Sequence, residues 1–451
     1  MAPVADLDPL FNPRSIAVVG ASNKPGKMGN LFIQRLAAGF RGALYAVNPS
    51  ERDVAGVATY RTVAELPEPI DVLIALVPAA ELMTVAEACR KNQVRFLFAI
   101  PSGFAETAAK GEEMQQRLAA IARSRGMRLL GPNIVGVMNG VLGLNASMMP
   151  ELPPGGKGLS CVTQSGGFGM ALSIYALDHG LHIAKFCDLG NTADLDVHEV
   201  VDYLADDPDT SVVGLFVESI KDRAAFLRAV ERAAARKPVL FTPVGVTSAG
   251  RRASLAHLGI SVSVTPLKTE LPVGVLTADT GLELLNGAKA LLWQPRSRGP
   301  RVAILTGTGG IGAELADLAA AHNLEVPSLS AMLQERLRAH LPYYASVQNP
   351  IDCTPIWWDY PKIYPQVLEE IAKSGEVDLA IVSVTDVAAT LPELASALGD
   401  WARRQPSIPS VLYWGARQKD HANMTVLEHG KIPCYPTTRE TVAAAVMLTR
   451  R

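Results

Sequence analysis

Ser15–Phe32 reads SIAVVGASNKPGKMGNLF, and this stretch decides the fold of the first part of the chain. The apolar run Ile16–Val19 predicts a buried β-strand, and Gly20, Gly26 and Gly29 follow it in a turn that leads into an amphipathic helix pattern. Strand, glycine loop and helix are typical of the opening of a doubly wound α/β domain. The loop amides and the helix N-terminus of such an opening can receive a phosphate-bearing ligand. The alternative is a glycine-rich turn that only packs the helix on the strand.

The details of this opening argue against NAD as the ligand. Gly20 and Gly26 stand six positions apart, whereas the first two glycines of the dinucleotide fingerprint stand two apart. The second predicted strand, Ala43–Val47, ends at Asn48-Pro49, where an NAD-binding protein usually carries an acidic residue for the ribose hydroxyls. The sequence therefore predicts a phosphate-bearing nucleotide other than NAD.

Composition narrows the class of protein. A chain of 451 residues is too long for one core and suggests about three domains. Apolar residues make up 48% and charged residues 19%, which is typical of a well-buried globular protein. The net charge is −2 with no cluster of Lys and Arg, which argues against nucleic acid and anionic membranes as partners.

The cysteines and the termini point to a cytoplasmic enzyme. Five scattered cysteines, without CxxC or metal-ligand spacing, predict reduced thiols and no metal site. No stretch approaches the length of a membrane span, and residues 1–13 lack the apolar core of a signal peptide. We expect a soluble cytoplasmic protein.

Strand-like runs alternate with helical periodicity along nearly the whole chain, which predicts an α/β protein with tandem doubly wound parallel sheets. Pro- and Gly-rich stretches at 150–158 and 294–300 suggest the boundaries. The expected domains are residues 1–150, 151–295 and 296–451. Residues 245–274 are expected to form a long loop, and loops of that length are usually functional or disordered.

Two further strand–glycine–helix junctions are candidate phosphate sites. Ser165, Gly166 and Gly167 lie in TQSGG, and Gly309 and Gly310 lie in TGTGG. Free amides in a first helical turn attract an anion, although glycine there also relieves crowding between helix and strand. Two such helix starts could hold one phosphate from both sides if their domains face each other.

Other residues of the second segment carry chemistry of their own. His257 lies in the expected long loop and could act as a nucleophile or simply bind a carbonyl. Glu218 follows the apolar strand Val213–Val217, where it could orient a histidine or cap the next helix. Asp194 and Asp196 are expected to cap the following helix.

These signals converge on one family. The chain resembles the α subunit of NDP-forming acyl-CoA synthetases, relatives of succinyl-CoA synthetase, over nearly its whole length. The resemblance rests on nine motifs in matching order and spacing: PRSIAVVGAS, VNP, PSGFAE, GPN-x-x-GVMN, TQSGGFG, LGNTADLD, GLFVESIKD, TGTGGIG and QNPIDCT.

The resemblance implies a CoA-binding Rossmann-like domain followed by two flavodoxin-like domains. It implies that His257 carries a phosphoryl group, that Glu218 supports it, and that the TQSGG-type and TGTGG-type helix starts hold phosphate. It places coenzyme A at a set of loop residues: Gly20, Ala21, Ser22, Gly26, Lys27, Gly29, Asn48, Pro49, Val77, Pro78, Pro101, Ser102, Gly103 and Asn133.

The sequence departs from the family pattern around the histidine. Ala256 and Leu258 replace the expected Ser and Thr, while Gly259 is retained. Residues 260–271 form a shorter and different segment, and the usual lysine of the preceding strand is replaced near Thr242-Pro243. These changes bear on the phosphohistidine and on acid specificity more than on the fold.

The family's ATP-grasp domain has no counterpart in these 451 residues, so the resemblance implies a separate ATP-grasp β subunit that binds ATP or GTP with Mg. The expected reaction joins a small carboxylic acid to CoA, with cleavage of NTP to NDP and phosphate, in a hetero-oligomer. A non-catalytic CoA- or acyl-CoA-binding subunit is one alternative. An NAD-linked oxidoreductase is another, which the first glycine loop and Asn48 disfavour.

Overall fold

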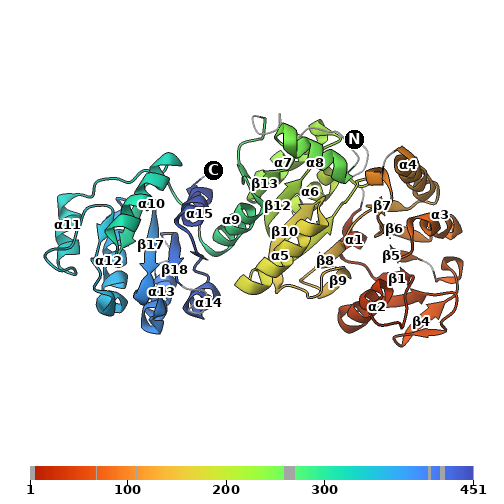
Figure 1. Cartoon of the computed structure of the whole chain (residues 1–451), viewed down its shortest axis with the longest axis horizontal. Coiled ribbons are helices and arrows are strands. Elements are labelled where there is room, and N and C mark those ends of the chain that lie inside the picture. The colour runs from red at the N-terminus through yellow and green to blue at the C-terminus, as the bar shows by residue number, and fades with distance from the viewer. Residues whose placement is uncertain are drawn as a thin grey trace. The chain divides into compact units, whose positions relative to one another are not determined.

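The computed structural model describes residues 6–67, 69–107, 109–258, 270–404, 408–416 and 422–449, without the side chains of 256–258 and 386. Residues 1–281 and 282–451 form two compact units. The first unit contains two seven-stranded sheets and the second a five-stranded sheet, each flanked by helices (Figure 1). Across the described ranges, no helix is long and apolar enough to cross a membrane.

The first sheet is built around β1, which comes from the opening stretch. Its strands lie in the order β3-β4-β2-β1-β5-β6-β7, and all pair in parallel except β3 with β4. β1 has β2 on one side and β5 on the other, so the chain order reverses there, as it does where α/β sheets bind ligands. The strands have these bounds: β1 Ser15–Val19, β2 Ala43–Val47, β3 Asp53–Val54, β4 Val57–Tyr60, β5 Ile70–Ala75, β6 Val94–Ala99 and β7 Arg128–Leu130.

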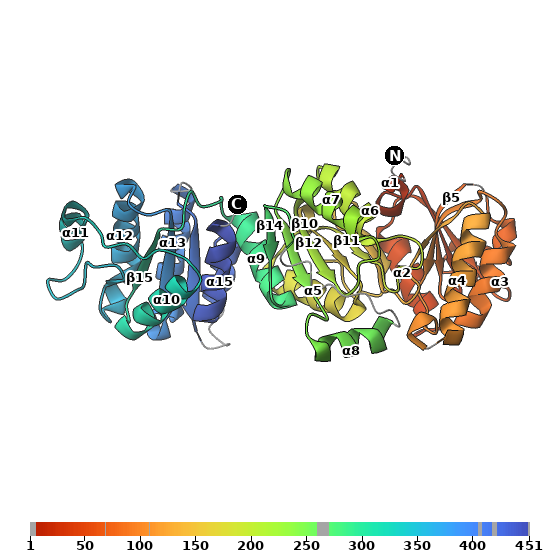
Figure 2. The same ribbon diagram turned by 90° about the horizontal axis from the view of Figure 1, so that it is seen from above.

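Helices cover both faces of this sheet because its central strands are apolar on both faces. Ile16 and Val18 pack in one core with Phe32 of α2, whereas Ala17 and Val19 pack in another core with residues of α3 and α4. Figure 2 shows α3 and α4 together and α2 apart from them. The helices of this part have these bounds: α1 Asp8–Phe11, α2 Met28–Gly39, α3 Ala79–Ala88 and α4 Ala109–Ser124, with 3₁₀ turns η1 Val63–Glu65 and η2 Ala105–Thr107.

The second sheet has the order β14-β13-β12-β10-β11-β8-β9. β8 and β9 were not among the predicted strands; they precede residue 150 but join this sheet as an antiparallel edge. The three-domain division stays a proposal. In the structure, β8 and β9 from the proposed first domain form an edge of the second sheet. The strands have these bounds: β8 Gly136–Asn139, β9 Leu144–Ser147, β10 Gly155–Thr163, β11 Ile183–Asp188, β12 Thr210–Val217, β13 Val239–Pro243 and β14 Val275–Thr277.

Helices α5 Gly166–His179, α6 Val197–Asp206 and α7 Arg223–Ala234 follow β10, β11 and β12. α5 lies on one face of the second sheet and α6 and α7 on the other (Figure 2). Asp196 caps α6 in a capping box with Glu199, as expected. The expectation for Asp194 is wrong, because its carboxylate binds Arg128 and the backbone N–H of Leu129 instead.

The expected loop at 245–274 contains a helix, α8, over Ser248–Leu258. The helix has no periodic apolar pattern, because its described side chains form no buried apolar stripe: Arg251 and Arg252 are exposed and Leu255 is 44% exposed. His257 therefore lies on a helical backbone rather than in a loop. Residues 259–269 lie outside the described residues.

The second unit has one parallel sheet of order β16-β15-β17-β18-β19. The buried ammonium of Lys289 anchors α9 to this unit, since its Nζ lies 2.6 Å from Glu428 Oε1 and 2.8 Å from the carbonyl oxygen of Cys434. Its elements have these bounds: β15 Val302–Thr306, β16 Ile351–Asp352, β17 Leu379–Thr385, β18 Ser410–Gly415, β19 Cys434–Tyr435, α9 Gly281–Trp293, α10 Gly309–Ala321, α11 Ala331–Arg338, α12 Tyr360–Ser374, α13 Pro392–Arg404, α14 Ala422–His429 and α15 Thr438–Thr449, with 3₁₀ turns η4 Trp357–Asp359 and η5 Asp386–Thr390.

Candidate functional site

The three glycines of the loop after β1 have two different roles: two allow close packing and one leaves open space. A Cβ on Gly20 would lie 2.8 Å from the carbonyl oxygen of Leu76, and a Cβ on Gly29 would lie 1.9 Å from that of Gly20. Gly29 is therefore needed for close packing of α2 on the loop after β1, and Gly20 for the close approach of that loop to Leu76. Gly26 has φ +79°, and apart from its own chain neighbours no heavy atom of the described residues lies within 4 Å of its Cβ position. The loop is therefore open at Gly26.

The start of α2 is suited to an anion. Within the described part of the chain, its N-cap residue Lys27 makes no side-chain capping hydrogen bond. The first amides of a helix have no intrahelical acceptor and lie at the positive end of the helix dipole. The open space at Gly26 lies directly before these amides, so the residues present fit a phosphate group.

Asn48, at the end of β2, is held by several hydrogen bonds of its side chain. Its Nδ2 donates to the carbonyl oxygen of Ala21 at 2.8 Å, and its Oδ1 accepts from the N–H groups of Ser50 and Glu51. Asn48 therefore ties two loops together, and Pro49 beside it is exposed. Glu51, which was not among the predicted site residues, accepts from Ser22 Oγ at 2.9 Å.

The pKa of Glu51 lies below its usual value, chiefly because the backbone N–H of Asn23 donates a hydrogen bond to the carboxylate. The hydroxyl of Ser22 donates a second hydrogen bond that lowers the pKa further. Glu51 lies three residues after Asn48, so a pattern search confined to the strand end passes over it. Its carboxylate is occupied in holding the glycine loop.

The other expected CoA residues lie at the ends of neighbouring strands. Val77 and Pro78 follow β5, and Val77 Cγ1 lies 3.4 Å from the Cβ position of Gly20. Pro101–Gly103 follows β6, with Ser102 exposed. Asn133 follows β7, and its N–H donates to the carbonyl oxygen of Pro101 at 3.1 Å. Because the strands are parallel, all of these residues gather at one carboxyl edge of the sheet.

The TQSGG segment lies at the carboxyl edge of the second sheet. Ser165 is the N-cap of α5, and its Oγ accepts from the N–H of Phe168. A Cβ on Gly166 would lie 2.4 Å from Val135 Cγ1, so that glycine is required by packing, whereas Gly167 is exposed. The start of α5 therefore presents backbone amides at an accessible position.

Gln164 links this helix start to Glu218. Its side chain is buried, and its Oε1 accepts from the N–H groups of Glu218 and Ser219, each at 2.9 Å. Its Nε2 donates to the carbonyl oxygen of Ser219 at 3.1 Å. The sequence analysis did not single out Gln164, although it stands inside TQSGG.

Glu218 directly follows β12 and is 7% exposed. The alternative of an exposed helix-capping acid is wrong, because Asp222 is the N-cap of α7 and accepts from the N–H of Ala225. A buried carboxylate at the carboxyl end of a parallel strand is placed as a functional acid would be.

His257 belongs to α8 by its backbone, and its side chain lies outside the described residues. α8 follows β13 and packs against η2, which lies in the PSGFAE motif. The structure thus brings the helix of His257 beside the loop expected to bind CoA.

The second unit repeats the helix start. Gly309 and Gly310 open α10 and are exposed, and no heavy atom of the described residues lies within 4 Å of the Cβ position of Gly310. A pocket of about 60 Å³ adjoins this start and is lined by Thr308, Trp357 and Ser383 among others.

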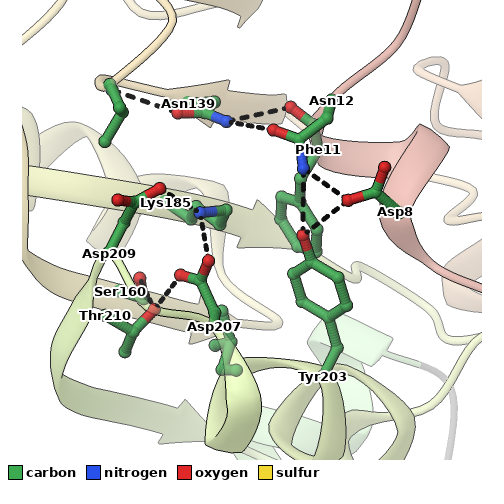
Figure 3. Close-up of polar contacts among 12 residues, drawn as sticks. Asp8, Phe11, Asn12, Asn139, Ser160, Lys185, Tyr203, Asp207, Asp209 and Thr210 are labelled. Carbon is green, nitrogen blue, oxygen red and sulfur yellow. Dashed lines mark hydrogen bonds and ion pairs between the residues drawn. The ribbon is translucent and has the colours of Figure 1, made fainter.

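A larger hollow, about 630 Å³, lies between α1 and α6 and is rich in aspartates. Its acids are engaged: Asp8 accepts from Asn12 Nδ2 at 2.7 Å, and Asp207 accepts from the buried Lys185 Nζ at 2.7 Å (Figure 3). Tyr203 stacks on Phe11 with ring centroids 5.0 Å apart. This region joins α1 to the second sheet away from the carboxyl edges.

The described residues contain no group of three or more His, Cys, Asp or Glu side chains that could hold a metal ion.

Comparison with known proteins decides the family. The chain is 32% identical over 454 residues to the α subunit of ADP-forming acetate–CoA ligase II of Pyrococcus furiosus, an alignment that covers 99% of this chain and 98% of that subunit. The chain belongs to the family of ADP-forming acyl-CoA ligase α subunits. The α subunit of ligase I of the same organism is 30% identical over 451 residues, covering 97% and 96% of the two chains.

Domain families and a solved ligase agree with this membership. The CoA binding domain family matches residues 14–140, and the succinyl-CoA ligase like flavodoxin domain family matches residues 156–291. The dinucleotide forming acetyl-coenzyme A synthetase 1 of Ca. Korarchaeum cryptofilum, solved with phosphate and ADP, is 30% identical with a TM-score of 0.89, covering 98% of this chain and 96% of that one. The expected α/β class with CoA-binding and flavodoxin-like domains is confirmed.

Some ligases of this family are longer. The ADP-forming acetate–CoA ligase of Methanocaldococcus jannaschii is 30% identical over 343 residues, and the alignment covers 75% of this chain but 48% of that protein. Three quarters of this chain therefore correspond to about half of that longer ligase.

Proposed function

We propose that this chain is the α subunit of a ligase that reversibly converts a carboxylic acid, CoA and NTP into acyl-CoA, NDP and phosphate. The observation that carries the proposal is the match to ligase α subunits over nearly the full length of both chains. An α subunit implies a partner, and we propose an ATP-grasp β subunit that binds ATP or GTP with Mg. The five cysteines are free and buried thiols, which fits the cytoplasmic location that we expect.

Coenzyme A is proposed to bind at the carboxyl edge of the first sheet. Its phosphates would lie at the open loop around Gly26 and the uncapped start of α2. The loops at Val77-Pro78, Pro101–Gly103 and Asn133 would border the rest of the molecule at the same edge. CoA supplies the thiol that becomes the thioester, while the chain holds and orients it.

His257 is proposed to carry the phosphoryl group between the partner and the acid. Its imidazole nitrogen forms a bond to the γ-phosphorus of NTP as the bond to the leaving NDP breaks. A carboxylate oxygen of the acid then forms a bond to phosphorus as the N–P bond breaks. Finally the CoA thiolate forms the thioester at the acyl carbon, and phosphate leaves.

Glu218 is proposed to accept a hydrogen bond from the second ring nitrogen of His257, which would fix the tautomer of the ring. The buried position of Glu218 beside Gln164 supports this role, since the backbone there is held firmly. The amides at Ser165–Gly167 and at Gly309-Gly310 are proposed to bind phosphoryl oxygens, each at a helix start with an exposed glycine.

One sequence feature favours a second candidate, a CoA- or acyl-CoA-binding subunit without catalysis. Ala256 and Leu258 remove two hydroxyl groups beside His257, about 1 kcal/mol each if both bound the phosphate. A loss of that size shortens the lifetime of a phosphohistidine rather than forbidding it, so the ligase remains the favoured function.

The acid is a separate question. Relatives with similar sequences are named for acetate, 4-hydroxybutyrate and trans-feruloyl-CoA synthesis, so family membership leaves the acid open. The test is to purify the chain with its ATP-grasp partner and to screen carboxylic acids for CoA-dependent NDP release. We expect turnover with at least one acid and no turnover by the chain alone. CoA binding without turnover on any acid would favour the second candidate.

A further inference from the structure

The turn η2 lies at a junction of the first unit. The N–H groups of Gly103 and Phe104 donate to Glu106 Oε1, the latter at 3.1 Å, so Glu106 closes the loop that carries Pro101–Gly103. α8, the helix of His257, packs against the same turn. η2 therefore lies between the proposed CoA loop, which it closes, and α8, which it contacts.

Burial alone would raise the pKa of Glu106, but hydrogen bonds from the Gly103 N–H and the Asn191 amide outweigh burial and lower it below the usual 4.5. Glu106 is therefore an ionised acceptor at neutral pH. Hydrogen bonds to a charged acceptor are stronger than neutral ones, so the turn is held firmly.

Asn191, from the loop after β11, binds this turn from the second sheet. The residue is completely buried, and its Nδ2 donates to Glu106 Oε2 at 2.6 Å and to Gln115 Oε1 at 3.0 Å. Its backbone N–H donates to the carbonyl oxygen of Pro132 at 3.0 Å, and its Oδ1 accepts from Asn133 Nδ2 at 3.4 Å. One buried amide thus contacts the loops after β6 and β7.

The loop of Asn191 also reaches the start of α5. Asp188, the last residue of β11, is 1% exposed, and its carboxylate accepts from the N–H groups of Val135 at 2.7 Å and Gly190 at 3.1 Å. A Cβ on Gly166 would lie 3.5 Å from Asp188 Oδ2. The carboxylate of Asp188 therefore lies beside Gly166, at the proposed phosphate-binding helix start.

The loop keeps an unfavourable backbone conformation at its centre. Thr192 is buried with φ +51°, a region that β-branched residues rarely adopt. Lys221 Nζ donates to the carbonyl oxygen of Thr192, and the next residue, Ala193, donates its N–H to the carbonyl oxygen of Gly131 at 2.9 Å. Such strain persists only where the surroundings determine the conformation, and it is concentrated at functional sites.

We propose that Asn191 is a positioning residue: through Glu106 it sets the CoA loop Pro101–Gly103 at a fixed place relative to the phosphate-binding start of α5. The inference rests on the proposed function. The CoA thiolate must reach an acyl carbon whose phosphate is held at α5, and small errors in such a distance slow a reaction severely. Asn191 itself touches neither CoA nor phosphate in this proposal.

The test exchanges the two hydrogen-bonding partners. Asn191→Asp places two carboxylates face to face, and Glu106→Gln places two amides face to face. Each single change is expected to raise KM for CoA and to slow thioester formation by roughly 10- to 100-fold. The double variant Glu106→Gln with Asn191→Asp restores one amide donor and one carboxylate acceptor between these two residues, but the hydrogen bond from Asn191 to Gln115 stays lost. We therefore expect it to be about threefold or more faster with CoA than either single variant.

A second measurement separates positioning from general damage. Phosphoryl labelling of the complex with NTP needs no CoA, so the single variants should label at the wild-type rate. Asn139→Asp is the matched control, because Asn139 is equally buried and donates to the carbonyl oxygen of Phe11 and to Asn12 Oδ1 (Figure 3). That control is expected to lower thermal stability without a selective change in KM for CoA.

The outcomes separate a failure of the proposed function from a failure of the role proposed for Asn191. A wild-type chain that binds no CoA refutes the proposed function. A wild-type chain that binds CoA, beside single variants with unchanged KM and thioester rate, refutes only the role of Asn191. If the single variants do not fold, a double variant that folds but stays slow with CoA also overturns it.

Discussion

Gly26→Ala is the change that tests the proposed CoA site most directly. Gly26 has φ +79°, and an alanine there meets no heavy atom of the described residues within 4 Å. The variant should therefore fold, at a cost of roughly 1 kcal/mol for a left-handed L-residue. Its methyl group would occupy the space in front of the first amides of α2, where the phosphate is expected.

The effect on binding follows from the hydrogen bonds that the phosphate would lose. A hydrogen bond to a charged group contributes about 1.5 kcal/mol or more, and 1.4 kcal/mol corresponds to a factor of about ten in Kd. Loss of one amide contact should therefore weaken CoA binding by about tenfold or more. Gly29 is unsuitable for this test, since its Cβ would lie 1.9 Å from the carbonyl oxygen of Gly20 and disturb the fold.

Gly375→Ala is the matched control. Gly375 follows α12 in the second unit with φ +70°, and the described residues leave its Cβ position equally free of heavy atoms within 4 Å. Calorimetric titration with CoA and with NAD, together with urea unfolding, compares the two variants. Both should lose similar stability, and only Gly26→Ala should lose CoA affinity. Equal CoA affinity in the two variants, or equal affinity of the wild type for NAD and CoA, would refute the reasoning.

Three further predictions concern the second sheet and the second unit. With the partner and labelled NTP, His257→Ala should abolish an acid-labile, base-stable phosphate and turnover, and Glu218→Gln should slow both; full activity of His257→Ala would exclude the phosphohistidine. The pKa of Asp378 lies below its usual 3.8, chiefly because the Arg301 side chain donates to it, so its contribution to stability is present above that value and is lost as pH falls through the lower folded pKa. Asp378→Asn should lower the free energy of unfolding at neutral pH and flatten its decline in acid. Urea unfolding between roughly pH 2 and pH 7 measures both effects, and wild type and variant should have about the same stability at the acid end. Asp196→Ala removes a capping box and should cost about 1 kcal/mol of stability by urea unfolding, with no change in Kd for CoA.

Local sequence determined the parts of this protein that depend on local physics. Continuous apolar runs such as Ile16–Val19 form strands buried on both faces, since a parallel sheet between two helical layers leaves no polar face. The glycine junctions near Gly20, Gly166 and Gly309 begin helices, because the chain must turn tightly there and the helix must pack closely. The order of the motifs along the chain was sufficient to predict the family.

Tertiary structure alone decided where these pieces meet. β8 and β9 are four residues each. β8 lies beside β11 through antiparallel pairing of residues 46 to 50 positions apart, such as Asn139 with Lys185 and Val137 with Cys187, and no local pattern encodes that pairing. α8 has no buried apolar stripe among its described side chains, so its sequence has no periodicity that predicts a helix. The hydrogen bond from Asn191 to Glu106 joins residues 85 positions apart, and it forms because two sheets bring their carboxyl-edge loops together. A local motif can specify a helix start, but contacts between distant loops exist only once the sheets have packed.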